Sequence, residues 1–181
     1  MDIRLKTLAL SDASALHAFE LENRSFFETM VPGRGDAYFQ EDNFREKLAD
    51  LLDEQRRDES WFYLIMNPDD EILGRINLVD LDPTRKSGHA GYRVAEAYTG
   101  RGIANKGLAL LIDAVSKRGI TKLFAKTTTN NIASQRVLEK NGFNQLQTED
   151  EVVELNGEML RFVNYEWTGE MKSDRTEYET D

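Results

Sequence analysis

The segment from Tyr98 to Phe143 constrains the fold most, because it combines two expected helices with turn residues at each end. Gly100 and Gly102 flank Arg101 directly before an apolar-periodic helix, and an expected strand then leads to a second helix that stops at Asn141–Gly142. Glycines allow a tight turn with free N–H groups, and the helix dipole adds positive potential at that end. Such a loop is typical of phosphate binding.

Three kinds of phosphate-binding loop compete for this stretch. A P-loop needs Gly-Lys followed by Ser or Thr, and that sequence does not occur in the chain. The Rossmann fingerprint would begin at Gly100, but Asn105 occupies its third glycine position and no acidic residue ends a following strand at the right distance. The third kind pairs the sequence GRGIA with the later sequence NIASQRVLEKNGF, and both halves are present.

GRGIA followed by NxxSxxVLEKNGF resembles the GNAT superfamily of acyl-CoA-dependent N-acetyltransferases. It is most similar to the RimJ/RimL branch, which acetylates protein N-termini, ribosomal ones included. Gly102 and Ala104 match the family's loop pattern, whereas Thr99 stands where that pattern has Gln or Arg. The resemblance is sharp from about Gly88 to Phe143 and looser up to about Trp167.

The resemblance implies acetyl-CoA as a cosubstrate and no metal. Acyl-CoA is expected in a wedge between two strands, Lys86–Val94 and Lys122–Thr127, with its pantetheine paired to the edge of the first strand. Addition of a ligand amide to a splayed strand edge is physically reasonable. The residues expected to bind the cosubstrate are Tyr92, Arg93, Val94, Thr99, Gly100, Arg101, Gly102, Ile103, Ala104, Asn131 and Ser134.

Asn131 and Ser134 lie on one face of the second helix at helical spacing. Asn131 fits both a helix cap and a cofactor contact, with Asn130 as a competitor for the cap. The resemblance makes Ser134 the contact of the CoA sulfur and the candidate proton donor to the leaving thiolate. The alternative is a first-turn serine that satisfies local backbone groups. Direct transfer in a ternary complex is the expected mechanism, because the chain has no cysteine for a thioester intermediate.

The general base is less well defined by the sequence. His89 lies on the wedge strand, on the same face as Gly91 and Arg93 by alternation. His89 is a candidate base because imidazole is the side chain that titrates nearest neutral pH. The alternative is that His89 is a half-exposed strand residue without a catalytic role. Glu151 and Glu154 in the last hairpin are rival bases, because the branch often uses a glutamate in that region.

Glu22 to Pro32 resembles the acceptor side of the family, so Asn23, Arg24, Phe26 and Phe27 are the candidate acceptor-binding residues. The alternative for the phenylalanines is a core position. A protein N-terminus is the preferred acceptor. The alternative acceptors are a polyamine, an amino sugar or an aminoglycoside. A non-catalytic acyl-CoA-binding module is the alternative from another class, since fold does not fix function. Dimers are common in the branch, which allows a homodimer.

The order of expected elements predicts one α+β domain over residues 1–168, with an acidic, disordered tail over 169–181. The resemblance makes this a GNAT-type fold, a seven-stranded, mostly antiparallel mixed sheet with helices on both faces. The turn Asn156–Gly157 predicts a hairpin. The other expected strands are Ile3–Leu8, Trp61–Met66, Ile72–Asp80, Leu146–Val153 and Glu158–Trp167, and the first two helices run from Ser11 or Asp12 to about Asn23 and from Gln40 to Arg57.

Composition excludes several classes of function. The chain has no cysteine and two histidines, which excludes thiolate metal sites and disfavours a histidine site. A formal net charge of −10 argues against nucleic acid as a partner and suits a cationic amine acceptor, or simply solubility. No apolar run approaches a membrane span and MDIRLKTL lacks a signal-peptide core. We therefore expect a cytoplasmic protein without a membrane partner.

Overall fold

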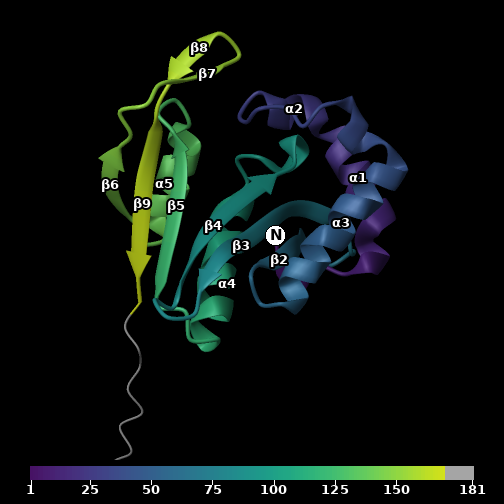
Figure 1. The fold of residues 1–181 in the computed structure, drawn as a ribbon, viewed down its shortest axis with the longest axis horizontal. Helices are drawn as coiled ribbons and strands as arrows, with labels where there is room; N and C mark the ends of the chain where they lie inside the picture. Colours follow the sequence, from purple (N-terminus) through teal and green to yellow (C-terminus); the bar gives the residue numbers. More distant parts are fainter. Residues whose placement is uncertain (170–181) are drawn as a thin grey trace, which may run out of the picture.

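The computed structural model describes residues 1–169, which form a seven-stranded sheet in the order β1-β2-β3-β4-β5-β9-β6 and a separate β7-β8 pair (Figure 1). Every neighbouring pair in the large sheet is antiparallel except β4 and β5. The strands are β1 (Arg4–Thr7), β2 (Trp61–Met66), β3 (Ile72–Asp82), β4 (Ser87–Val94), β5 (Lys122–Thr128), β6 (Asn144–Thr148), β7 (Val153–Leu155), β8 (Glu158–Leu160) and β9 (Phe162–Thr168). The helices are η1 (Leu10–Asp12), α1 (Ala13–Glu22), α2 (Arg24–Glu28), η2 (Asp36–Phe39), α3 (Glu41–Arg56), η3 (Glu96–Tyr98), α4 (Ile103–Lys117) and α5 (Ile132–Lys140).

Strand β2 is buried on both faces and separates two hydrophobic cores. Its alternate residues Trp61, Tyr63 and Ile65 pack with the apolar sides of α4 and α5. The intervening residues, Phe62 among them, pack with α1, α2 and α3 on the opposite face. The sheet therefore carries helices on both faces, and the predicted fold class is confirmed.

Strands β4 and β5 diverge soon after they begin. They pair only at Ser87, Gly88 and His89 of β4 with their partners on β5. Beyond His89, β4 continues to Val94 in contact with β3, while β5 pairs with β9 on its other side. Within residues 1–169, the edge of β4 that faces β5 therefore has no strand partner from Ala90 to Val94, which is the wedge that the family resemblance implies.

The predicted C-terminal hairpin is wrong in its pairing, although its turn is confirmed. Asn156 and Gly157 have φ angles of 51° and 81°, the positive values that a two-residue hairpin turn requires. The turn joins only the short strands β7 and β8, whereas β6 pairs separately with β9 with an irregularity in register. The chain between β6 and β7 therefore leaves the large sheet, and the β7–β8 hairpin projects from its end (Figure 1).

Two further differences concern the ends of elements. A short helix, α2, follows α1 after Asn23 and had no counterpart among the expected elements. The predicted acidic tail lies outside the described residues apart from Gly169. None of the helices in residues 1–169 is both long and apolar enough to cross a membrane.

Candidate active site

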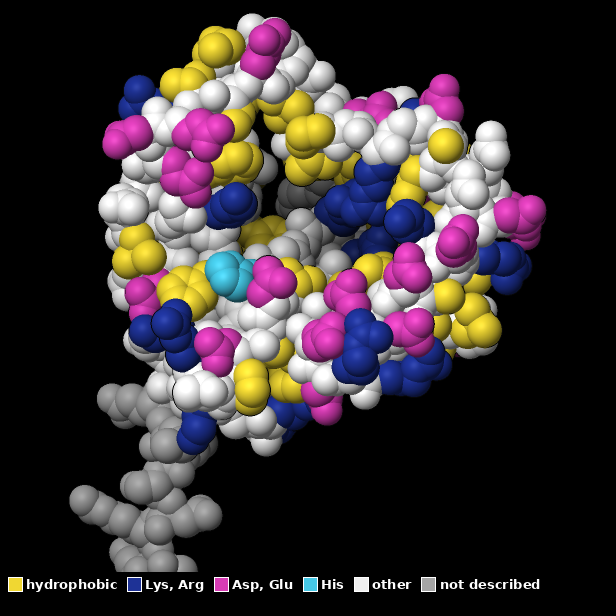
Figure 2. All heavy atoms as spheres, viewed as in Figure 1, with side chains coloured by type: hydrophobic (Ala, Val, Ile, Leu, Met, Phe, Trp, Pro, Cys, Tyr) yellow, Lys and Arg dark blue, Asp and Glu magenta, His cyan; other side chains and the backbone are white. Residues whose placement is uncertain are grey.

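The wedge between β4 and β5 opens into a cleft of about 700 Å³. Its walls come from α2 on one side, from β5 and Phe162 on the other, and from the start of α4 and the outer face of α5. Figure 2 shows this side of the molecule hollowed between its two halves. The lining is mostly apolar with a few polar groups, which is the usual composition of a site for an organic ligand.

The glycine loop forms one wall of the cleft in the way that the sequence predicts. Gly100 and Gly102 have φ angles of 72° and 75°, and Gly102 is the N-cap of α4. Gly102, Ile103 and Ala104 all line the cleft, so the unpaired N–H groups of the first turn lie at its wall. A helix start of this kind attracts phosphate through its N–H groups and its dipole.

The side chains of the loop differ in their positions. Thr99 lines the cleft, and its hydroxyl donates to the carbonyl of Glu96 at 2.8 Å. Arg101 does not line the cleft, and its guanidinium lies over the ring of Tyr98, with Cζ 5.4 Å from the ring centroid. The cradle is therefore built from backbone and small side chains.

Asn131 is the N-cap of α5, since its side-chain oxygen accepts from the backbone N–H of Ser134 at 3.1 Å. Asn130 instead contacts Thr128 and Glu158, so Asn131 rather than Asn130 caps the helix. Asn131 and Ser134 both line the cleft, opposite the free edge of β4. Their common face therefore looks toward the ligand space, as helical spacing predicts.

Tyr92 is a residue that the sequence reading expected to act only through its backbone. Its hydroxyl lies 3.0 Å from Oγ of Ser134 and 3.3 Å from the Ser134 carbonyl oxygen. Burial raises the pKa of Tyr92 to about 12, with the nearby Tyr165 adding to the rise and the Ser134 hydrogen bond opposing it. The phenol therefore stays protonated at neutral pH and is available as a donor to Ser134.

Arg93 points to the opposite face of the sheet from Tyr92, as strand alternation predicts. Its Nη1 lies 3.4 Å from Oε2 of Glu20 on α1, and its Cζ lies 4.9 Å from the Phe27 ring centroid. The wedge thus has two sides, one built around Ser134 and the other around Arg93. Val94 is buried and also lines the cleft.

The candidate bases all lie outside the lining of the cleft. His89 is exposed at the last paired position of β4, with its ring 5.2 Å from that of Phe124. Glu151 and Glu154 are exposed on the segment that leads into and forms β7. None of the described residues that line the cleft is Asp, Glu or His. The structure does not test base catalysis by His89, Glu151 or Glu154, but their positions outside the lining favour another route for the amine proton.

The four candidate acceptor residues fall into different environments. Asn23 is buried, with its amide spanning the carbonyl of Phe19 and the N–H of Glu96, so its visible role is to tie α1 to η3. Phe26 and Phe27 line the cleft, and Phe27 also belongs to the core. Arg24 lies in a neighbouring recess, bound to Glu28 and Asp36.

Two side-chain contacts at the site could not be expected from the sequence. Glu20 lies within the first predicted helix, where no sequence pattern marks it, yet it is buried and paired with Arg75 and Arg93. Asn156 of the β7–β8 turn donates to the carbonyl oxygens of Glu28 at 3.0 Å and Thr29 at 3.3 Å. This contact joins the two sides of the cleft.

A mixed sheet that splits beside a glycine loop at a helix start defines the class of acyl-CoA-dependent N-acyltransferases. A family model described as the acetyltransferase (GNAT) domain matches residues 2–144. The chain belongs to the GNAT acetyltransferase family. The predicted enzyme class, an acetyl-CoA-dependent N-acetyltransferase, is thereby confirmed. Among residues 1–169 no group of three or more His, Cys, Asp or Glu side chains could hold a metal ion.

Similar proteins agree with this family. The probable N-acetyltransferase YjcK of Bacillus subtilis strain 168 is 27% identical over 158 residues, which cover 86% of this chain and 87% of that protein. The ribosomal-protein-serine acetyltransferase of Escherichia coli K12 is 23% identical over 78% of each chain. RimL, a ribosomal L7/L12 α-N-protein acetyltransferase solved with coenzyme A, has a TM-score of 0.84 at 23% identity, covering 93% of this chain and 95% of that one. This last likeness shows the fold, and the relatives support the RimJ/RimL-like branch.

Proposed function

We propose that this protein transfers the acetyl group of acetyl-CoA directly to the N-terminal α-amine of a protein. The observation that carries the proposal is the two-sided wedge, which gives a thioester and an amine separate approaches to one strand edge. The Ser134 side joins the glycine loop, and the Arg93 side is walled by α2. Two relatives that acetylate ribosomal proteins support the choice of acceptor.

In the proposed reaction the neutral amine attacks the thioester carbonyl carbon, the C–N bond forms and the C–S bond then breaks. Backbone N–H groups on the free edge of β4 are suited to stabilise the oxyanion. The hydroxyl of Ser134 gives its proton to the leaving thiolate and takes one from the hydroxyl of Tyr92, 3.0 Å away, and Tyr92 regains a proton from the water that receives the amine proton. The proton of the attacking nitrogen leaves through water in the cleft, because no carboxylate or imidazole of residues 1–169 lines it.

The test is release of free CoA from acetyl-CoA with short peptides that begin with Ser, Ala or Met. The matched controls are the same peptides with a blocked α-amine and a lysine further along. We expect release only from peptides with a free N-terminus, and mass spectrometry should locate the new acetyl group on that nitrogen. Release from the blocked peptides instead would refute N-terminal transfer and point to a side-chain amine.

A further inference from the structure

The charge inside the cleft has the opposite sign to the charge of the chain. The formal net charge is −10, yet the described residues that line the cleft include four cations and no acid. Arg136 and Lys140 lie on α5, where phosphate groups of a cosubstrate would be compensated. Arg93 and Lys126 lie on the strands, on the acceptor side of the wedge. Figure 2 shows Lys and Arg side chains grouped at one wall of the hollow.

Arg93 belongs to a group that holds one positive charge in excess. Glu20 shares its two carboxylate oxygens between Arg75 at 2.6 Å and Arg93 at 3.4 Å. The side chains of Glu20 and Arg75 are 2% and 6% exposed, while that of Arg93 is 24% exposed. Two guanidinium groups thus depend on one carboxylate, and Arg93 is the one that ligands can reach.

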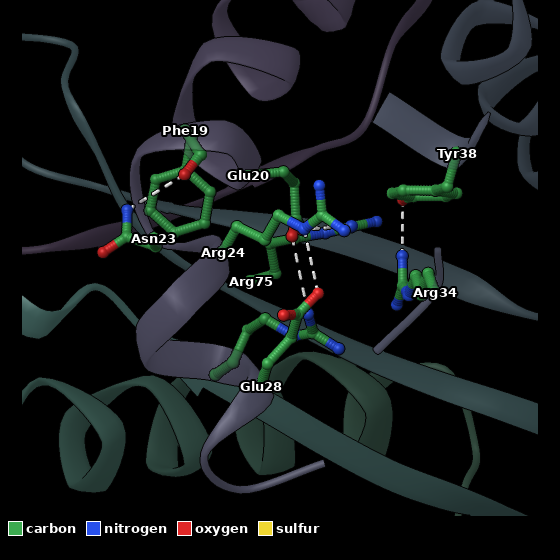
Figure 3. Close-up of polar contacts among 9 residues, drawn as sticks. Phe19, Glu20, Asn23, Arg24, Glu28, Arg34, Tyr38 and Arg75 are labelled. Carbon is green, nitrogen blue, oxygen red and sulfur yellow. Dashed lines mark hydrogen bonds and ion pairs between the residues drawn. The ribbon is translucent and has the colours of Figure 1, made fainter. Parts of the chain in front are cut away.

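Arg34 adds to this excess from the loop after α2. Its guanidinium lies over the ring of Tyr38 and donates to the Tyr38 hydroxyl (Figure 3), and it makes no ion pair within residues 1–169. Arg24 is paired with two carboxylates, Glu28 and Asp36, so these three groups carry one negative charge and the cluster as a whole keeps a single positive charge in excess. The pKa of Arg93 is lowered, first by burial and then by the charges of Arg34 and Arg75, with Glu20 acting in the opposite direction. An added anion would relieve this repulsion.

The geometry leaves room for such an anion. A recess of about 20 Å³ has five charged residues in its lining, which are Glu20, Arg24, Glu28, Arg34 and Arg93. It shares Phe27, Val31 and Arg93 with the large cleft, so the two spaces adjoin at these three residues. The recess alone is about the size of one water molecule, so a bound anion would reach Arg93 mainly from the cleft. Arg34 lines the recess and not the cleft, so it would act on that anion through its charge. A guanidinium presents a planar fork of donors that fits a carboxylate.

We propose that Arg93 and Arg34 form an anion subsite that selects acceptors carrying a carboxylate close to the reactive amine. This inference rests on the proposed function and refines it: the preferred acceptor is a protein N-terminus with Asp or Glu directly behind the first residue. The same positive charge disfavours the ammonium form of the bound amine. It therefore increases the neutral fraction that can attack, which suits a cleft without a carboxylate. Polyamines, which carry only positive charge, are poor acceptors.

The first test compares amidated peptides Ser-Asp-Ala-Phe, Ser-Asn-Ala-Phe and Ser-Lys-Ala-Phe as acceptors in the CoA-release assay. Amidation leaves the Asp side chain as the one carboxylate. We expect kcat/KM to be about tenfold or more higher for the Asp peptide than for the Asn peptide, as for a charge-assisted hydrogen bond, and lowest for the Lys peptide. The difference should shrink with added salt. Equal kcat/KM for the Asp and Asn peptides would overturn the subsite.

Variants of Arg34 test the same subsite without disturbing the buried ion pairs. Arg34→Gln should reduce the preference for Asp over Asn, and Arg34→Glu should shift it toward the Lys peptide, with KM for acetyl-CoA unchanged. Arg85→Gln is the matched control, because Arg85 is exposed on the β3–β4 turn, 3.7 Å from Asp82. It should keep the wild-type preference. An undiminished preference in both Arg34→Glu and Arg93→Gln would refute the assignment.

Failure of this inference is distinguishable from failure of the proposed function. Release with all three peptides at equal efficiency overturns the subsite and keeps N-terminal transfer. Absence of CoA release with every peptide overturns N-terminal transfer. In that case β-alanine and spermidine are assayed as acceptors to test the anion subsite separately. Release of CoA with β-alanine but not with spermidine supports the anion subsite, with a small amino acid as the acceptor. Release with spermidine, or silence with every amine, overturns both proposals.

Discussion

Replacement of Tyr92 by Phe should slow turnover with little change in stability. The substitution removes one hydroxyl that lies 3.0 Å from Oγ of Ser134 and keeps the ring that packs against the larger core. Ser134 faces the cleft, where water can replace the lost partner, so the cost is that of one ordinary hydrogen bond, about 0.5–1.5 kcal/mol. If the bond is needed mainly in the transition state, kcat should fall by about three- to tenfold.

The assay is kcat at saturating acetyl-CoA for Tyr92→Phe, Ser134→Ala and the double variant. If Tyr92 acts through Ser134, the double variant should be no slower than Ser134→Ala alone, because the two hydroxyls then form one unit. Additive losses, or a wild-type kcat for Tyr92→Phe, would refute the relay. KM for acetyl-CoA should change less than kcat, since the proton that passes from Tyr92 through Ser134 is needed only when the C–S bond breaks.

The same variant has a pH signature in stability. The pKa of Tyr92 is 10.0 when unperturbed and about 12 in the folded protein, so the folded state keeps a proton that the unfolded state loses. The free energy of unfolding should therefore be unaffected below pH 10 and should fall by about 2–3 kcal/mol as pH rises toward 12. Tyr92→Phe should show a smaller fall in alkaline urea titrations. An identical fall in both proteins would mean that the phenol is not buried as described.

Three further predictions concern other parts of the site. Glu20→Gln should lower the free energy of unfolding by about 3 kcal/mol, because Arg75 and Arg93 lose a buried partner. The control Glu41→Gln, at an exposed ion pair, should lower it by less than about 0.5 kcal/mol. Equal urea midpoints for the two variants would contradict this prediction. Gly102→Ala should cost about 1 kcal/mol at its φ of 75° and raise KM for acetyl-CoA, while Gly91→Ala, with open space and no positive φ, should leave stability intact. His89→Gln should keep the pH dependence of kcat/KM near neutrality, because its ring stacks on Phe124 outside the cleft; loss of that dependence would make imidazole the base.

Local sequence patterns predicted most of the residues on the cosubstrate side of the site. The αL glycine at the start of α4, the cap by Asn131 and the opposed directions of Tyr92 and Arg93 each depend on residues a few positions apart. The turn at Asn156–Gly157 was predictable for the same reason. Conformational preferences of this kind act before any tertiary contact forms, so they can be seen in one sequence.

The acceptor side depended on contacts that local signals cannot specify. Glu20 meets Arg75 across 55 positions of sequence, and a glutamate on an amphipathic helix normally faces solvent. The split of the last hairpin into β6–β9 and β7–β8 pairs is decided by the edge that β5 offers to β9. Glu154 lies on β7, which is not part of the large sheet, and it does not line the cleft. Sequence periodicity indicates such strands but not their partners.

The contact of Asn156 with the end of α2 has a consequence for how an acceptor arrives. The β7–β8 hairpin hydrogen-bonds to the carbonyl oxygens of Glu28 and Thr29, so the two walls of the cleft are joined by a strap. For the protein acceptor proposed above, a chain end would pass beneath this strap as a single length of polypeptide, whereas an internal lysine would have to bring a doubled chain through the same opening. Chain thickness, rather than the chemistry of nitrogen, would then distinguish an α-amine from an ε-amine, and acetylation would favour chain ends that are still free of folded structure.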